Sequence, residues 1–213
     1  MLVQNPSKIF TSDLAVWQKE PACILTEIIG GQDSSLRKTA EIIFDKNGCY
    51  DFCYQAGSVI LIVVLYGEIT INDFEKPISA EQVFTLRSGE SSALMMKNNL
   101  PDEKSDVLVF ELKSKTEGDF FAVEELNVSA KNTLIQISEN IGYPNFMGLY
   151  DGRKEERYAL YKKGGSIFGM VINGAFEFQN RLMENRDAII ISEMDMLEFE
   201  ALSENALMVL LEV

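Results

Sequence analysis

The sequence of this chain repeats itself. The stretch YDFCYQAGSVILIVVLYGEITI, residues 50–71, has the same pattern as YALYKKGGSIFGMVINGAFEF, residues 158–178. Each begins with a short run that contains tyrosine, turns at Gly-Ser, continues as an apolar run and turns again at a glycine, Gly67 or Gly174. Each then leaves that turn as an alternating run. Such a repeat predicts two structural copies and constrains the fold more than any single segment does.

The correspondence continues towards the end of each copy. VFTLRSGES (residues 83–91) lies where NRDAIIISE (185–193) lies in the second copy, and VLVFEL (107–112) matches LMVLLEV (207–213). One repeated hairpin pattern can arise by chance in a β protein. Several matches in the same order favour a duplication instead.

The local patterns are those of β-strands. Short runs that alternate or are rich in β-branched residues recur between Gly, Asn and Asp, and few segments have helical spacing, so we expect an all-β fold. With 213 residues, of which 46% are hydrophobic, the chain can bury one large core or two small ones. The repeat favours two antiparallel β-barrels in tandem, at residues 1–115 and 133–213, with the more polar stretch 116–132 as a crossover linker.

The second copy indicates which side chains share a face. Asn173 and Gly174 are a strong hairpin signal because both tolerate positive φ. The strand after this turn alternates with period two, so Phe176 and Phe178 face one way and the polar residues beside them face the other. MLEFEAL (residues 196–202) alternates in the same manner. The simplest assignment places both apolar sets inside the barrel.

The chain contains no histidine. The usual metal ligand, and the side chain that ordinarily titrates near neutral pH, are therefore missing. This excludes Ser-His-Asp and Cys-His catalysis and His-ligated zinc or iron. The 33 acidic and 19 basic residues give a formal charge of -14, which disfavours nucleic acid and anionic membranes as partners.

The sequence predicts a cytoplasmic protein. The N-terminal stretch MLVQNPSKIF lacks a basic region followed by a hydrophobic segment, so no secretory signal is expected. Cys23, Cys49 and Cys53 are an odd set without framework spacing, which suits a reducing compartment. The longest apolar run, SVILIVVLY (58–66), is strand-sized and much shorter than the roughly 20 residues of a membrane span.

Several segments of the second copy are similar to those of a known family. DGRKEERYAL, GAFEFQNRL, RDAIIISE and FEALSENALMVLLEV resemble the C-terminal barrel of pirin-like bicupin proteins, a group that includes some bacterial flavonol dioxygenases. The likeness is good over residues 148–213 and weaker over residues 8–113. It implies two antiparallel cupin barrels of the double-stranded β-helix type, in agreement with the repeat.

The resemblance also implies where a metal would be held. In that family the N-terminal barrel usually carries one metal ion, held by several His and a Glu from two cupin motifs. The corresponding positions here hold other side chains: Ile60, Cys53 and Gln55 in the first copy, and Ile167, Leu160 and Lys162 in the second. The usual site cannot form from these residues, so we expect neither a metal nor another cofactor.

Two groups of side chains are candidates for ligand binding. The candidate residues are Tyr50, Cys53, Tyr54, Tyr158, Tyr161, Glu177, Glu198 and Glu200. Tyrosines at the start of each repeat suit a small planar ligand or a packed barrel rim. Cys53 is interpreted first as a small buried residue. Glu198 and Glu200 lie about 7 Å apart on one strand face, and with Glu177 opposite they would bind a hard cation, do acid–base work or form a solvated face.

These observations lead to a main hypothesis and alternatives. The main hypothesis is a non-enzymatic bicupin module without the usual metal site, which binds a small apolar or aromatic ligand in one barrel or a protein partner through its surface. The first alternative is a divergent cupin enzyme, with a carboxylate-bound metal or none, acting on a small phenolic or sugar-like compound. The second is an inert dimer subunit whose lumen is filled by side chains such as Phe168, Met170 and Phe176. A homodimer through exposed edge strands is left open.

Overall fold

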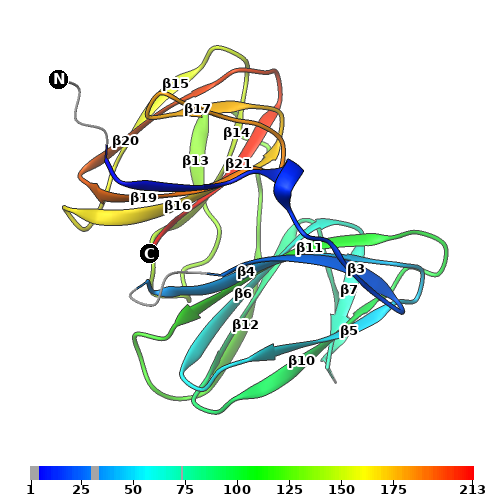
Figure 1. Cartoon of the computed structure of the whole chain (residues 1–213). Helices are drawn as coiled ribbons and strands as arrows, with labels where there is room; N and C mark the ends of the chain where they lie inside the picture. The colour runs from blue at the N-terminus through cyan, green and yellow to red at the C-terminus, as the bar shows by residue number, and fades with distance from the viewer. Residues whose placement is uncertain (1–4, 30–33, 73) are drawn as a thin grey trace. The chain divides into compact units, whose positions relative to one another are not determined.

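Strands make up nearly all the regular structure of the part of the chain that the computed structural model describes, residues 5–29, 34–72 and 74–213 (Figure 1). The exception is a short 3-10 turn, η1 (Ser12–Leu14). This confirms the predicted all-β class. Within the described ranges there is no helix that is long and apolar enough to cross a membrane.

The strands form two compact units, the first barrel and the second barrel. The first barrel consists of residues 16–126 and 138–142. Its strands are β2 (Gln18–Glu20), β3 (Cys23–Ile29), β4 (Leu36–Phe44), β5 (Cys49–Tyr54), β6 (Ser58–Tyr66), β7 (Glu68–Ile71), β8 (Phe74–Ser79), β9 (Gln82–Ser88), β10 (Ser92–Asn98), β11 (Ser105–Lys113) and β12 (Phe120–Glu125).

The second barrel consists of residues 127–137 and 143–213 together with the N-terminal segment up to residue 15. Its strands are β1 (Ser7–Phe10), β13 (Thr133–Gln136), β14 (Asn145–Tyr150), β15 (Glu155–Ala159), β16 (Gly165–Asn173), β17 (Phe176–Phe178), β18 (Arg181–Met183), β19 (Ala188–Met194), β20 (Met196–Ala201) and β21 (Ala206–Glu212).

Apart from β2, which has no counterpart among the described strands of the second barrel, the sheets of the two barrels have the same strand order, which confirms the predicted duplication. The larger sheets run β12-β9-β6-β11-β4-β3-β2 and β1-β19-β16-β21-β14-β13, and the smaller sheets run β5-β10-β7-β8 and β15-β20-β17-β18. All the pairings between these strands are antiparallel. Each element that was matched in the sequence takes the equivalent place: β6 with β16, β9 with β19, and β11 with β21.

The units differ from the predicted bounds at one edge strand of each larger sheet and at residues 138–142, which belong to the first barrel. Strand β1, expected in the first barrel, pairs with β19 of the second barrel over residues 7–10 (Figure 1). The stretch 116–132, expected as a linker, contains β12, which pairs with β9 of the first barrel. The reason is that each larger sheet takes its edge strand from outside its own repeat, so β1 serves the second barrel as β12 serves the first.

Each barrel encloses an apolar core between its two sheets. In the first barrel the core includes Ile60, Ile62 and Val64 from β6, and Val107 and Val109 from β11. These residues alternate along their strands, as expected for strands with one face inside a barrel.

The core of the second barrel is rich in aromatic rings. Phe176 and Phe178 stack with an interplanar angle of 2° and centroids 5.7 Å apart, and Tyr150 meets Phe199 edge-on at 5.3 Å. Such offset and edge-to-face pairs are the favourable arrangements of aromatic rings. The apolar faces of β17 and β20 therefore point inward, as predicted.

Of the three side chains that were expected to fill the lumen of the second barrel, only Phe176 lies in its core. Phe176 lies in the second core, with 0% of its surface exposed. Phe168 and Met170 are buried too, but they lie on the opposite face of β16 from the core residues Ile167 and Val171. Because side chains of a strand alternate between faces, the expectation for Phe168 and Met170 is corrected.

The turn at Gly174 requires glycine for two reasons. Its φ is +80°, and an added Cβ would lie 2.3 Å from the Ser203 Oγ, which accepts a hydrogen bond from the Ala175 N–H. Gly164 also has positive φ (+66°), but an added Cβ there has no heavy atom within 4 Å. We expect Gly164→Ala to lower the free energy of unfolding by about 1 kcal/mol and Gly174→Ala by about 2–3 kcal/mol, measured by urea denaturation. Equal losses of unfolding free energy in the two variants would show that a Cβ at residue 174 makes no close contact with Ser203.

Candidate functional site

The positions to which the resemblance assigns metal ligands do not form a metal site. Ile60 and Ile167 are buried in the first and the second core, and Leu160 also belongs to the second core. A transition metal needs nitrogen, sulfur or oxygen ligands around one point, and aliphatic side chains supply none. Among the residues that the structure describes, no group of three or more His, Cys, Asp or Glu is placed to hold a metal ion. The metal of the family therefore does not fit this chain.

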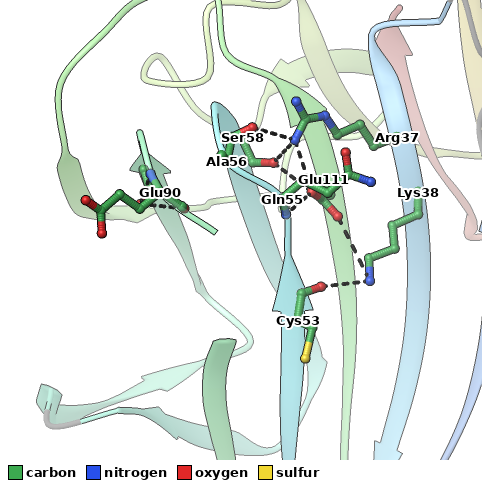
Figure 2. A network of polar contacts seen from close by, with 9 residues as sticks. Arg37, Lys38, Cys53, Gln55, Ala56, Ser58, Glu90 and Glu111 are labelled. Carbon is green, nitrogen blue, oxygen red and sulfur yellow. Dashed lines mark hydrogen bonds and ion pairs between the residues drawn. The ribbon is translucent and has the colours of Figure 1, made fainter. Parts of the chain in front are cut away.

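A buried carboxylate lies next to the first of these positions. Glu111 on β11 pairs in register with Ile60 on β6 and with Lys38 on β4, and 1% of its side chain is exposed. Figure 2 shows that Glu111 points towards the loop between β5 and β6. Its Oε1 accepts hydrogen bonds from the backbone N–H of Gln55 (2.8 Å) and from the hydroxyl of Ser58 (2.7 Å). The carboxylate thus joins β11 to this loop.

Two cations complete the network (Figure 2). Arg37 Nη1 lies 3.5 Å from Glu111 Oε1 and donates to the Ala56 carbonyl at 3.0 Å. Lys38 Nζ lies 4.0 Å from Glu111 Oε2 and donates to the Cys53 carbonyl at 2.9 Å. The two basic side chains balance the buried negative charge and bind carbonyl groups of the loop and of the end of β5, so the network is structural in character.

The second barrel has a buried carboxylate at the equivalent place. Glu212 on β21 pairs in register with Ile167, as Glu111 does with its isoleucine. Its carboxylate accepts hydrogen bonds from the Tyr158 hydroxyl (2.7 Å) and from the backbone N–H groups of Tyr161 (2.7 Å) and Lys162 (3.4 Å). Burial, and next the hydrogen bond to Glu212, raise the pKa of Tyr158 far above its ordinary value.

The candidate residues at the start of each repeat have different surroundings. Tyr50 and Tyr54 pack, half-buried, against the first core, and burial raises the pKa of Tyr50. Cys53 is exposed, which corrects the expectation of a buried residue: it alternates with the two inward tyrosines and therefore faces outward. In the second barrel Tyr158 lies in the core, whereas 79% of Tyr161 is exposed. These five side chains thus have no common environment: two are half-buried, two are exposed and one lies in the core.

The three candidate glutamates, in contrast, lie together. Glu177, Glu198 and Glu200 line a pocket of about 500 Å³. They belong to β17 and β20, whose apolar residues point into the core, so the pocket opens on the outer face of the sheet β15-β20-β17-β18. The other residues that line the pocket are Glu155, Glu156, Arg157, Gln179, Asn180 and Phe199. We call this surface the acidic face.

Three glutamates of the acidic face form a row across neighbouring strands. Glu200 pairs in register with Glu155 on β15 and with Glu177 on β17. Directly paired residues of an antiparallel sheet have Cβ atoms about 4.5–5.5 Å apart, and like charges at that spacing are destabilising. The row therefore concentrates negative charge at a cost in stability.

Two arginines offset this charge in part. Arg157 Nε lies 3.0 Å from Glu198 Oε1, and Arg153 Nη1 lies 3.5 Å from Glu200 Oε1. The arginine side chains are 71% and 81% exposed, respectively, and exposed ion pairs contribute only about 0–1 kcal/mol. Both arginines can therefore exchange their carboxylate partner for another group at little cost in free energy. The face stays acidic because its glutamates outnumber these two arginines.

The sequence reasoning missed Glu155, Glu111 and Glu212. Glu155 precedes the candidate Tyr158 in a run that has no clear apolar alternation, and only the register of β15 with β20 brings it beside Glu200. Glu111 and Glu212 did carry a signal. Each is a single acidic residue near the end of an apolar strand, at the same place in both copies of the repeat.

The comparisons with known proteins agree on the fold. No family model and no curated protein matches the sequence. Bacterial pirin YhhW from Escherichia coli, in a structure with nickel(II), matches with a TM-score of 0.83 at 11% identity over 98% of this chain and 99% of that chain. GK1651 from Geobacillus kaustophilus matches with a TM-score of 0.76 at 12% identity, over 100% and 97%.

A quercetin 2,3-dioxygenase from Acinetobacter baumannii also matches, with a TM-score of 0.73 at 10% identity over 97% of this chain and 78% of that chain. The protein thus has the fold of a bicupin, and more narrowly that of the pirin-like bicupins. At identities this low the likeness concerns the fold alone.

Proposed function

We propose that this protein is a non-enzymatic bicupin module that binds a protein partner through its outer surface. The observation that supports this most is the filled interior of the barrels. Ile60 and Ile167 occupy the metal-ligand positions, and stacked rings including Phe176 and Phe178 occupy the second lumen. A ligand inside a barrel would have to displace close-packed core side chains.

The other functions considered have less support. A small apolar or aromatic ligand needs an apolar cavity, whereas the pocket on the second barrel is polar and open to solvent. A divergent enzyme acting on a phenolic or sugar-like compound needs catalytic groups held in a site that excludes water. The carboxylates of the acidic face are partly exposed, and Glu198 and Glu200 pair with exposed arginines.

The acidic face favours a partner with a basic, extended segment. Glu155, Glu200 and Glu177 lie side by side across three strands, so their charges would meet a segment that crosses the sheet. A net charge of -14 also attracts a basic partner from a distance and speeds its encounter. Lysine or arginine side chains at alternate positions of such a segment would point at the row together.

Binding of a synthetic octapeptide of alternating Lys and Thr tests this function. We expect the peptide to bind, and we expect the double variant Glu177→Gln/Glu200→Gln to weaken binding about 3- to 10-fold, because each lost charge removes a partly exposed ion pair. Raising the salt from 50 to 300 mM should weaken binding to the wild-type protein. Isothermal titration calorimetry measures both effects.

A matched pair of substitutions controls for net charge. Glu90→Gln/Glu117→Gln removes the same two charges at exposed positions of the first barrel and should change the affinity less than 2-fold. Equal losses in the two double variants would mean that the peptide responds only to net charge. No binding at 50 mM salt would overturn the assignment of a basic partner.

A further inference from the structure

The two barrels share one feature that the proposed function does not use, a buried carboxylate near the end of β11 in the first barrel and of β21 in the second. Glu111 and Glu212 are 1% and 7% exposed. Each pairs in register with the isoleucine, Ile60 or Ile167, that occupies a metal-ligand position. Each also lies on the inward face of its strand, two residues beyond a core residue. The two glutamates are therefore structurally equivalent.

Both carboxylates bind the loop between the first two matched strands of their barrel. In the first barrel this loop connects β5 to β6, and Glu111 accepts from Gln55 N–H and from the Ser58 hydroxyl. In the second it connects β15 to β16, and Glu212 accepts from Tyr161 N–H and Lys162 N–H. We call these two segments the hairpin loops.

The donors differ between the barrels although the acceptor is the same. Arg37 and Lys38 assist Glu111, whereas the Tyr158 hydroxyl assists Glu212. What the copies share is thus the anion at this position and its bond to a backbone N–H of the loop. Hydrogen bonds to an ionised acceptor are roughly twice as strong as neutral ones, so a single carboxylate can hold a loop.

We propose that Glu111 and Glu212 act as latches: each carboxylate fixes the hairpin loop of its barrel to the strand that carries the glutamate, β11 in the first barrel and β21 in the second. In metal-containing relatives implied by the resemblance, a metal held by two motifs would tie separate strands together. In this chain Ile60, Leu160 and Ile167 occupy three of those positions, and a carboxylate with protein donors ties the loop instead. The inference is independent of the acidic face and of any partner.

Amide hydrogen exchange of the full chain, followed by NMR, tests the latches one at a time. In Glu111→Gln we expect the Gln55 amide to exchange about 10- to 100-fold faster than in the wild-type protein, with no change at the Tyr161 amide. In Glu212→Gln we expect the reverse. Each variant is thus the control for the other, since both remove one buried charge.

Two outcomes would overturn the proposal. One is unchanged exchange at the loop amide of the variant barrel. The other is an equal increase at amides throughout that barrel, such as Ile62 on β6, which would mean general destabilisation. If a Glu→Gln variant fails to fold, Ser58→Ala and Tyr158→Phe each remove one donor and keep the carboxylate. A local increase of about 3- to 10-fold in these variants supports the latch, and its absence contradicts it.

Discussion

Phe176→Ala is expected to lower the free energy of unfolding by about 3–5 kcal/mol. The ring of Phe176 is fully buried, stacks on Phe178 and meets Tyr150 and Phe199 nearly edge-on. Its loss removes apolar area from the core and leaves a cavity that the surrounding rings can fill only in part. Since small domains are stable by only about 5–15 kcal/mol, this is a large fraction of the total. Urea denaturation followed by circular dichroism measures the change.

Leu182→Ala is the matched control for this variant. Leu182 lies on β18, in the same sheet as Phe176, but 60% of it is exposed. We expect its truncation to change the stability by less than about 0.5–1 kcal/mol. Similar losses in the two variants would show that the second core is not packed as described.

The cavity left by Phe176→Ala also tests the filled lumen on which the proposed function depends. A dry apolar cavity in a protein core can bind benzene. We therefore expect benzene to raise the melting temperature of Phe176→Ala and to leave that of the wild-type protein unchanged. A comparable rise in the wild-type protein would reveal a lumen open to apolar ligands and would favour that function instead.

The parts of the fold that the sequence predicted are those with a short-range physical cause. Alternation with period two determines which residues of β17 and β20 face the core, and this was read correctly from residues 176–178 and 196–202. The duplication was visible because the two copies keep the same order of turns and apolar runs. Ordered turns and runs were sufficient to match β6 with β16 and β11 with β21.

The edge strands could not be predicted because their partners lie far away in the sequence. Of the four residues of β1, three are exposed, so the strand has no apolar face that would signal its place. It is held by its ladder with β19 and by contacts such as Ser12 N–H to the Asp187 carboxylate at 2.7 Å. Strand β12 lies in a stretch whose polar composition suggested a linker. Pairing across such distances depends on the assembled sheet.

Only part of the candidate site could be predicted, because alternation within a strand is visible in the sequence whereas the register between strands is not. Glu198 and Glu200 were placed on one face from alternation alone, and their position in the pocket agrees. The row that includes Glu155 depends on the register between strands, which the sequence does not show. The tyrosines were proposed from their position in the repeat. The structure separates them because Tyr158 turns into the core while Tyr161 follows in an exposed loop.

Alkaline pH is expected to destabilise the second barrel through two buried tyrosines. Burial, followed by hydrogen bonds to Glu156 and Glu212, raises the pKa of Tyr150 and of Tyr158 far above the ordinary value of 10. Above pH 10 both hydroxyls ionise in the unfolded chain but keep their protons in the folded one. The unfolded state then binds fewer protons than the folded state. The contribution of these two tyrosines to the free energy of unfolding is therefore fully present below pH 10 and is lost as the pH rises above 10.

The expected loss between pH 8 and pH 11 is about 3 kcal/mol for the two tyrosines together, since each ionisation in the unfolded chain contributes about 1.4 kcal/mol per pH unit above pH 10. The double variant Tyr150→Phe/Tyr158→Phe should be less stable than the wild-type protein at pH 8, because two buried hydrogen bonds are lost. Its further decline up to pH 11 should be smaller by this amount. Lysine deprotonation and the net charge act on both proteins alike, so urea denaturation at both pH values isolates the contribution of the two tyrosines. Parallel pH profiles would show that the two hydroxyls ionise as readily in the folded barrel as in the unfolded chain.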